Sequence, residues 1–120
     1  MGDLTENFSR SEFACHCGCG FDDIKDHHVE MLQKVRTEIG GPMIINSGCR
    51  CMSHNMDVGG VPHSAHMRGE ASDVACMDAT NRYILIGAAL KVGFNRIGVA
   101  KTFVHLDRDP FLPAPRLWVY

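Results

Sequence analysis

Apolar residues in the first third of the chain recur with helical spacing. From residue 23 to residue 39 they fall three to five positions apart, and the sequence Gly-Gly-Pro at residues 40–42 ends the pattern. The apolar positions are Ile24, Val29, Leu32, Val35 and Ile39. This spacing places them on one face, so the pattern predicts an amphipathic helix over residues 23–39. Residues 1–23 are rich in Cys and Gly, and we expect an irregular opening segment there.

Short apolar runs dominate the rest of the chain and are typical of strands. They cover residues 43–47, 71–76, 96–101, 103–107 and 116–120, and a second helix is expected between Asp78 and Gly93. Between the first two strands, residues 48–70 show no period, and loops of this length are usually functional. The order predicts an α+β fold with a mainly antiparallel sheet, in a single domain over residues 1–120.

Composition narrows the classes of partner. The formal net charge is -2, which does not provide the basic surface that nucleic acid binding needs. Uninterrupted apolar runs are all shorter than the roughly 18 residues of a spanning helix, so we expect no membrane partner. The first ten residues lack a basic region followed by an apolar one, so we expect synthesis in the cytoplasm without a signal peptide. We expect a monomer.

Strand alternation gathers candidate ligands on one face of the predicted sheet. In residues 103–107, His105 and Asp107 share a face, while Val104 and Leu106 share the other and are expected to face the core. In residues 71–75, Asp73 is flanked by two alanines, which leave room for an ion. His66, Asp73 and His105 form a mixed imidazole and carboxylate set that could hold a catalytic zinc with an open fourth position. Spacing alone leaves other triples open, because the chain has seven histidines.

Several segments resemble the zinc D-Ala-D-Ala carboxypeptidase family. The stretch SAHMRGEASD at residues 64–73 fits the signature SxHxxGxAxD of this family, which includes peptidoglycan endopeptidases and phage endolysins. FSRSEFACHCGCGF, INSGCRCMSHNMDVGG and FVHLD are similar to further family segments and occur in the same order. The resemblance implies the fold shared with the Hedgehog signalling domain, with helices packed on one side of the sheet.

The resemblance also implies roles for individual residues. It implies zinc as cofactor, with His66, Asp73 and His105 as its ligands. It implies that Arg50 binds substrate and stabilises charge on the attacked carbonyl, and that Ser64 supports the substrate site by a hydrogen bond.

The family pattern leaves the general base unassigned in this chain. Many family members carry an acidic residue three positions before the last histidine ligand, where this chain has Thr102. Asp107 is the leading candidate for the base, and its alternative role is to orient a metal ligand. His63 is a second candidate, or else an exposed loop residue.

The implied function is zinc-dependent hydrolysis of amide bonds in the peptide part of bacterial peptidoglycan, as an endopeptidase or a D,D-carboxypeptidase. We expect a phage or prophage origin, with action on the wall after release or as a virion component. The alternative is a non-catalytic zinc-containing module that binds the cell wall or has a structural role on the same fold. The missing acid at Thr102 favours this alternative.

Other side chains have roles that the sequence leaves open. The six cysteines could be thiols, disulfides or ligands of a second metal; they are Cys15, Cys17, Cys19, Cys49, Cys51 and Cys76. Next to Arg50, where the family usually has an aromatic residue, Cys49 is expected to pack or else to compete for metal. We expect His54 to support the loop, the pair His27 and His28 to be solvated, and Trp118 and Tyr120 to lie in the core or at the sheet edge rather than on substrate.

Overall fold

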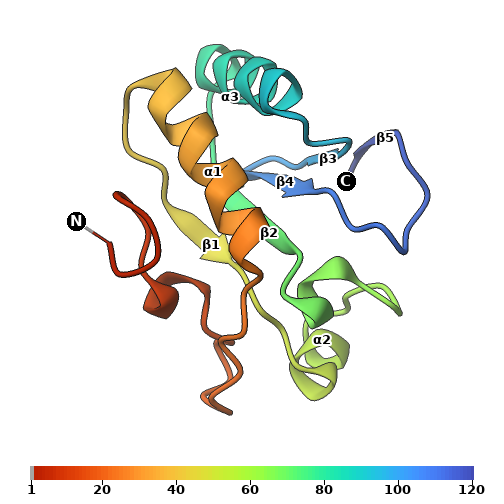
Figure 1. Cartoon of the computed structure of the whole chain (residues 1–120). Coiled ribbons are helices and arrows are strands. Elements are labelled where there is room, and N and C mark those ends of the chain that lie inside the picture. Colours follow the sequence, from red (N-terminus) through yellow and green to blue (C-terminus); the bar gives the residue numbers. More distant parts are fainter. Residues whose placement is uncertain (1) are drawn as a thin grey trace.

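The computed structural model describes residues 2–120, so Met1 lies outside the described residues. Within residues 2–120, the chain begins with two helical elements and ends with three consecutive strands (Figure 1). The helical elements are the 3₁₀ helices η1 (Arg10–Phe13) and η2 (Ala65–Arg68) and the α-helices α1 (Asp26–Ile39), α2 (Met52–Asp57) and α3 (Ala79–Val92). The strands are β1 (Ile45–Ser47), β2 (Ala71–Ala75), β3 (Arg96–Val99), β4 (Phe103–Asp107) and β5 (Arg116–Val119).

The strands form one sheet in the order β1-β2-β4-β3-β5. β5 pairs in parallel with β3, and the other neighbours pair antiparallel. The prediction of an α+β fold with a mainly antiparallel sheet is therefore confirmed. The parallel pairing of β5 places the C-terminal strand at the sheet edge beside β3, although β4 lies between them in sequence.

The core lies between one face of the sheet and the helices α1 and α3, which also pack against each other (Figure 1). The helices contribute apolar side chains such as Leu32 and Leu85. The sheet contributes Val74, Val104 and Leu106 from β2 and β4. Because side chains alternate along a strand, the residues next to Val74, Val104 and Leu106 point to the opposite face of the sheet. That opposite face carries the candidate ligands.

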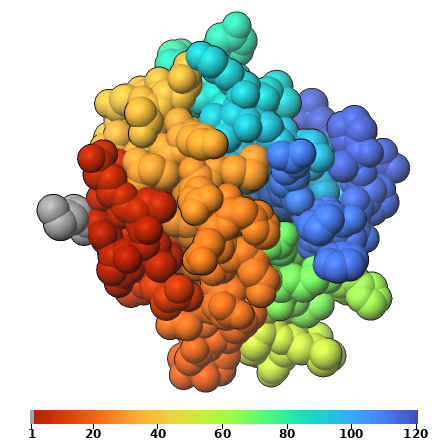
Figure 2. Space-filling model, viewed as in Figure 1, coloured from red at the N-terminus to blue at the C-terminus, as the bar shows by residue number. Residues whose placement is uncertain are grey.

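The opening segment packs along the side of α1. Figure 2 shows the first residues, in red, lying against the orange segment that contains α1. Gln33 of α1 accepts a hydrogen bond from the Thr5 hydroxyl at 2.8 Å and donates one to the Asn7 side chain at 2.7 Å. Phe8 and Phe13 are fully buried in the core. The segment predicted as irregular is therefore fixed in place by side-chain contacts and by the short helix η1.

Residues 48–70 contain more structure than the sequence predicts. The helix α2 and the 3₁₀ helix η2 interrupt the expected loop. The six residues of α2 are too few to show a helical period, and its N-cap is a cysteine: Cys51 Sγ accepts a hydrogen bond from the backbone of His54. A cysteine is not among the side chains that usually mark a helix start.

The first helix also differs from expectation at its start. It begins at Asp26, and of the two histidines that follow, His27 is exposed but His28 is only 2 % exposed. The prediction that both are solvated is wrong for His28. Its Nε2 hydrogen bonds with the hydroxyl of Ser72 at 2.8 Å, and its ring packs edge-on against Phe94. Adjacent helix positions point about 100° apart, so one neighbour faces the core and the other faces solvent.

No helix within residues 2–120 combines the length and the apolar composition needed to cross a membrane.

Candidate metal centre and cleft

Two of the predicted ligands lie side by side on adjacent strands. The register of β2 and β4 pairs Asp73 directly with His105. Both residues are buried on the sheet face that points away from α1 and α3. His105 Nδ1 lies 3.0 Å from Asp73 Oδ1. The alternation inferred from the sequence is therefore confirmed for this strand pair.

The third predicted ligand, His66, reaches the same point from the 3₁₀ helix η2. The hydroxyl of Ser64 caps this helix by accepting a hydrogen bond from the backbone N–H of His66 at 3.2 Å. Gly69 ends it with a φ of 68°, a left-handed conformation that favours glycine. A Cβ atom at this glycine would also collide with the backbone of Asp23. This short turn directs His66 Nε2 to a position 3.2 Å from Asp73 Oδ1.

The three side chains form a compact donor set. One ligand atom from each of His66, Asp73 and His105 can be chosen so that all lie within 4.8 Å of one another. The far nitrogen of each imidazole faces an acceptor: His66 Nδ1 donates to the Gly48 carbonyl at 2.6 Å, and His105 Nε2 donates to Asp107 at 2.6 Å. The near nitrogens therefore direct lone pairs at a carboxylate oxygen, so a cation or a proton must lie between them. This donor set fits a zinc ion.

The charges of these groups depend on one another. Burial alone would raise the pKa of Asp73, but hydrogen bonds from His105 and His66 hold it well below its usual value. Burial alone would lower the pKa of His105, but the hydrogen bonds to Asp107 and Asp73 raise it above its usual value. Asp73 is thus a carboxylate at neutral pH, as a metal ligand must be.

Asp107 lies behind His105 and is fully buried. One of its oxygens accepts the hydrogen bond from His105, and the other accepts a hydrogen bond from the backbone N–H of Asp109 at 2.9 Å. Arg96, paired with it across β3 and β4, lies 3.0 Å from the carboxylate. Burial would raise the pKa of Asp107, but these donors, His105 first, lower it. Every side of the carboxylate is therefore engaged by protein groups.

The donor set lies in a cleft of about 620 Å³. Arg50 and Ser64 line one part of it, and the guanidinium of Arg50 donates to the Ser64 hydroxyl at 3.3 Å. Within the described residues, the buried Nε of Arg50 has no hydrogen-bond partner. Both residues that the resemblance assigns to substrate therefore border the same cavity as the three ligands.

Aromatic residues at the C-terminal end of the chain form another part of the cleft, a role that the sequence analysis did not favour. β5 is an edge strand, as expected, but Trp118 and Tyr120 line the cleft. The Trp118 ring lies 5.3 Å from the His105 ring and packs under the Arg96 guanidinium. It crosses β3 above Gly98, where a Cβ atom would collide with the indole. A glycine within a strand signals such a close approach, so Gly98 was the available clue.

The weaker candidate for the general base, His63, and the position of the missing acid, Thr102, both lie outside the cleft. His63 is exposed and does not line the cleft, and Thr102 is exposed at the turn before β4. Among the described residues that line the cleft, Asp73 and Asp107 are the carboxylates. His54 was expected to support the loop. Its backbone N–H donates a hydrogen bond to Cys51 Sγ at the start of α2, and it is not among the described residues that line the cleft.

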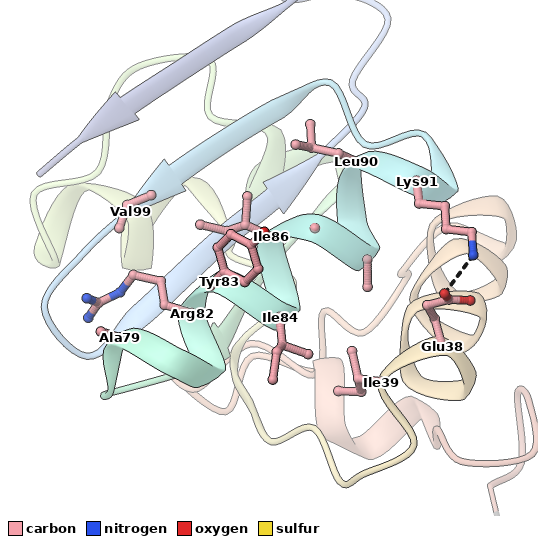
Figure 3. A pocket seen from close by; sticks show the side chains of 12 residues that line it. Glu38, Ile39, Ala79, Arg82, Tyr83, Ile84, Ile86, Leu90, Lys91 and Val99 are labelled. Atoms are coloured by element: carbon pink, nitrogen blue, oxygen red, sulfur yellow. Dashed lines mark hydrogen bonds and ion pairs between the residues drawn. The ribbon is translucent and has the colours of Figure 1, made fainter.

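A second depression of about 790 Å³ lies on the outer side of α3 (Figure 3). Its lining is mostly aliphatic, with Tyr83 at its centre and an ion pair of 2.7 Å between Lys91 and Glu38 at its rim. Its described lining holds neither histidine nor cysteine, so it offers no comparable donor set.

Comparison with known proteins adds a family match. The family model described as Peptidase M15 matches residues 6–107, which include the three candidate ligands, Arg50 and Asp107. A search of curated proteins finds no match.

Proposed function

The chain belongs to the peptidase M15 family, and from this premise we propose that it is a zinc peptidase that hydrolyses amide bonds in the peptide part of bacterial peptidoglycan. The family membership makes it a metallopeptidase and agrees with the resemblance in the sequence. The proposal rests chiefly on one observation: two imidazoles and one carboxylate converge within 4.8 Å at the base of a cleft.

His66, Asp73 and His105 would hold the zinc ion. They supply two nitrogens and one oxygen, a ligand set used in catalytic zinc sites, and the cleft lies on the side that the protein leaves free. Zinc bound there would polarise the scissile carbonyl and lower the pKa of a water molecule towards neutrality. The Gly48 carbonyl holds the His66 ring in the tautomer that presents Nε2 to the metal.

We propose that Asp107 orients His105. The sequence left open whether this residue is the general base or holds a ligand. Its oxygens are engaged by His105, Arg96 and the backbone of Asp109, and its side chain is fully buried. A base must reach the proton it accepts, whereas an orienting carboxylate needs only its contact with the ligand. The contacts of Asp107 support the orienting role.

Arg50 is proposed to bind substrate and to stabilise negative charge on the attacked carbonyl. It lines the cleft close to the ligands, and its buried Nε still lacks a partner. Ser64 steadies this side chain by accepting from its Nη2 atom and would keep it near the substrate. A guanidinium donates directional hydrogen bonds to carbonyl and carboxylate oxygens.

The charge of the cleft fits an acidic peptide. Arg50 and Arg116 line it in addition to Arg96, which is neutralised by Asp107. The peptide stems of peptidoglycan carry carboxylates on side chains and at their ends, which such guanidinium groups would attract. Origin in a phage or prophage, and action after release or as part of a virion, stay predictions from the resemblance.

The second candidate function is a non-catalytic zinc-containing module that binds the cell wall or serves a structural role. The observation that favours it is the absence of an acidic side chain at Thr102, which is an exposed residue outside the cleft. Such a module would keep its metal and bind wall fragments without cutting them.

Digestion of purified muropeptides separates the two candidates. The zinc-loaded protein is incubated with fragments of defined structure, and the new amine and carboxylate ends are identified by mass spectrometry. We expect cleavage of one type of amide bond that is lost in His66→Ala and retained in His27→Gln, which changes an exposed imidazole outside the cleft. Binding of the same fragments without new ends would exclude the enzyme and support the module.

A further inference from the structure

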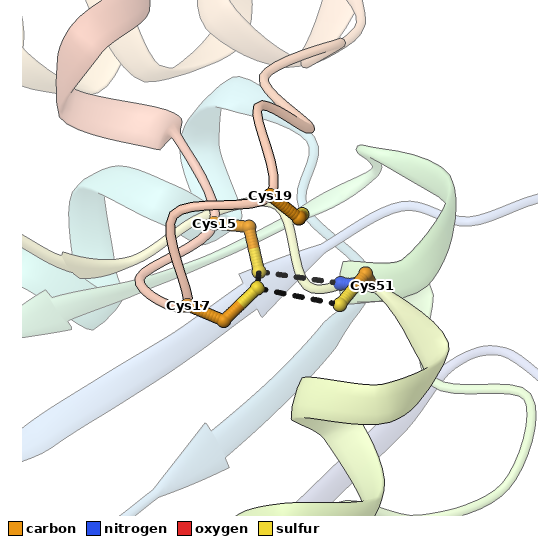
Figure 4. A group of neighbouring side chains, drawn as sticks. All are labelled: Cys15, Cys17, Cys19 and Cys51. Atoms are coloured by element: carbon orange, nitrogen blue, oxygen red, sulfur yellow. Dashed lines mark hydrogen bonds between the residues drawn. The ribbon is translucent and has the colours of Figure 1, made fainter.

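A group of four cysteines lies outside the cleft lining. Cys15, Cys17 and Cys19 come from the opening segment, and Cys51 comes from the N-cap of α2. Figure 4 shows the side chains of the two segments turned towards each other. We propose that this four-cysteine group is a structural zinc site, separate from the catalytic metal centre.

The spacing of the sulfur atoms fits a shared ion. Cys17 Sγ lies 3.5 Å from Cys15 Sγ and 3.6 Å from Cys51 Sγ, and all four sulfurs lie within 4.8 Å of one another. In a tetrahedral site with Zn–S bonds of about 2.3 Å, neighbouring sulfurs are about 3.8 Å apart. The four side chains therefore stand close to the corners of a zinc tetrahedron.

The backbone of the opening segment is shaped to bring its three cysteines together. In an extended strand, alternate residues lie about 6.8 Å apart, which is too far for their side chains to bind the same ion. Gly18 and Gly20 have φ values of 81° and 91°, which glycine adopts readily. The turn is closed by a hydrogen bond from the Cys15 N–H to the Phe21 carbonyl at 2.8 Å. Glycine therefore makes the convergence possible.

Backbone N–H groups point at three of the sulfurs. Cys15 Sγ accepts from the N–H of Cys51 at 3.4 Å, Cys51 Sγ accepts from the N–H of His54 at 3.3 Å, and Cys19 Sγ accepts from the N–H of Phe21 at 3.5 Å. Such donors stabilise negative charge on sulfur and orient a metal ligand. Two of the cysteines, Cys17 and Cys19, are nevertheless exposed, so burial of thiols does not explain why the group assembles.

Four thiolates and a tetrahedral arrangement favour zinc among the common metals. With four protein ligands the site is closed and has no position for water or substrate, which is the mark of a structural site. The ion would join the opening segment to Cys51, immediately after Arg50. Since the N–H of Cys49 also donates to the Phe13 carbonyl at 2.8 Å, the backbone would be held on both sides of Arg50.

Metal analysis of the full chain, purified with zinc under reducing conditions, tests the proposal. We expect two zinc ions per chain, one for each donor group. The double variant Cys17→Ser with Cys51→Ser should lose one zinc, and His66→Ala should lose the other. Cys76→Ser, which changes a buried cysteine outside the group, should keep both. After exchange for cobalt, sulfur-to-cobalt charge-transfer absorption should persist in His66→Ala and vanish in the double cysteine variant.

Alkylation of the unmodified protein gives a second measurement that does not depend on the folding of a variant. The exposed Cys17 and Cys19 should react slowly with zinc bound and rapidly after a chelator is added, whereas the buried Cys49 and Cys76 should react slowly throughout the native state. The proposal is overturned by a single zinc that leaves in His66→Ala, by exposed thiols that react equally fast with and without zinc, by a disulfide within the group, or by iron in place of zinc.

Discussion

The chain presents two groups of candidate metal-ligating side chains that are built in opposite ways. His66, Asp73 and His105 are buried beneath a cleft, and two of them stand on neighbouring strands of the sheet. The cysteine group, Cys15, Cys17, Cys19 and Cys51, lies in loops and at a helix start and is partly exposed. Side-chain and carbonyl acceptors orient the first group, and backbone N–H groups orient the second.

The difference indicates that the first group suits catalysis and the second suits stabilisation of the fold. Three protein donors beside a cleft leave a coordination position that substrate or water can reach, whereas four protein donors complete the coordination of zinc. The sheet holds Asp73 and His105 in place, whereas the loops that carry the cysteines would gain rigidity from a bound ion. Substitutions in the first group should therefore remove activity, and substitutions in the second should mainly reduce stability.

The largest effect is expected for Asp73→Ala. It removes the carboxylate that both histidines face, so the catalytic zinc is lost while the cysteine group keeps its ion. Because the metal supplies several kcal/mol of transition-state stabilisation, peptide hydrolysis should fall by more than about a thousandfold. Kinetics and metal content are measured on the same sample. Asp57→Asn, at an exposed carboxylate, should change neither, and retention of both zinc ions in Asp73→Ala would contradict the assignment.

Arg50→Ala is expected to have the next largest effect. Loss of one donor to the developing oxyanion costs roughly a hundredfold to a thousandfold in kcat. Both zinc ions should stay bound, which separates this loss from that in Asp73→Ala. Arg50→Lys should recover part of the activity, because it restores the charge but not the directional donors. The exposed Arg108, changed to Ala, serves as the control. Unchanged kcat in Arg50→Ala would remove the residue from the mechanism.

Asp107→Asn distinguishes the two roles open for this residue. If it orients His105, the substitution should weaken zinc binding or activity by about 10-fold to 100-fold, and excess zinc should restore much of the rate. If it is the general base, zinc affinity should stay constant while the rate falls and does not recover with zinc. We expect the first result, because His105 Nε2 donates to Asp107 at 2.6 Å. Zinc titration followed by rate measurement on each sample decides between them.

Strand alternation explains why much of the candidate metal centre could be predicted from the sequence. Alternation is a local property of strands, so residue spacing alone puts His105 and Asp107 on one face of their strand and Asp73 on the same face as two alanines of its own strand. The signature around His66 supplied the third position. These inferences needed no knowledge of how distant segments pack, and the register of β2 and β4 agrees with them.

Long-range packing determines what the sequence did not reveal. The engagement of Asp107 by Arg96 depends on the register of β3 with β4, and the position of Trp118 over Gly98 depends on a parallel pairing between segments separated by β4. Local sequence patterns do not reveal such pairings between distant segments. The cysteine group likewise forms only because Cys51 folds back onto the opening segment. Local patterns therefore identified the candidate metal ligands, while the residues that contact them became apparent only from the tertiary structure.

The smallest effect concerns a buried imidazole that is not in either metal-ligating group. His28 packs on the opposite side of the sheet from the cleft, where burial, followed by the charge of His66, lowers its pKa from 6.5 to about 3. The unfolded chain therefore binds a proton at His28 between about pH 6.5 and pH 3, and the folded chain does not. Stability must fall as the pH decreases through this window, by up to about 1.4 kcal/mol per pH unit from this residue.

His28→Gln should make the pH dependence of stability shallower, because glutamine can hydrogen bond with Ser72 but does not titrate. The free energy of unfolding, measured by urea denaturation at pH 6.5, 5.5 and 4.5 with constant zinc, gives the slope for each protein. The slopes of unfolding free energy against pH for wild type and His28→Gln should differ by an amount that corresponds to nearly one bound proton. The substitution His27→Gln, at an exposed position, should leave a slope closer to that of wild type. Parallel curves for wild type and His28→Gln would mean that His28 keeps its proton when buried. In that case burial beside the sheet would not require the neutral form of this imidazole.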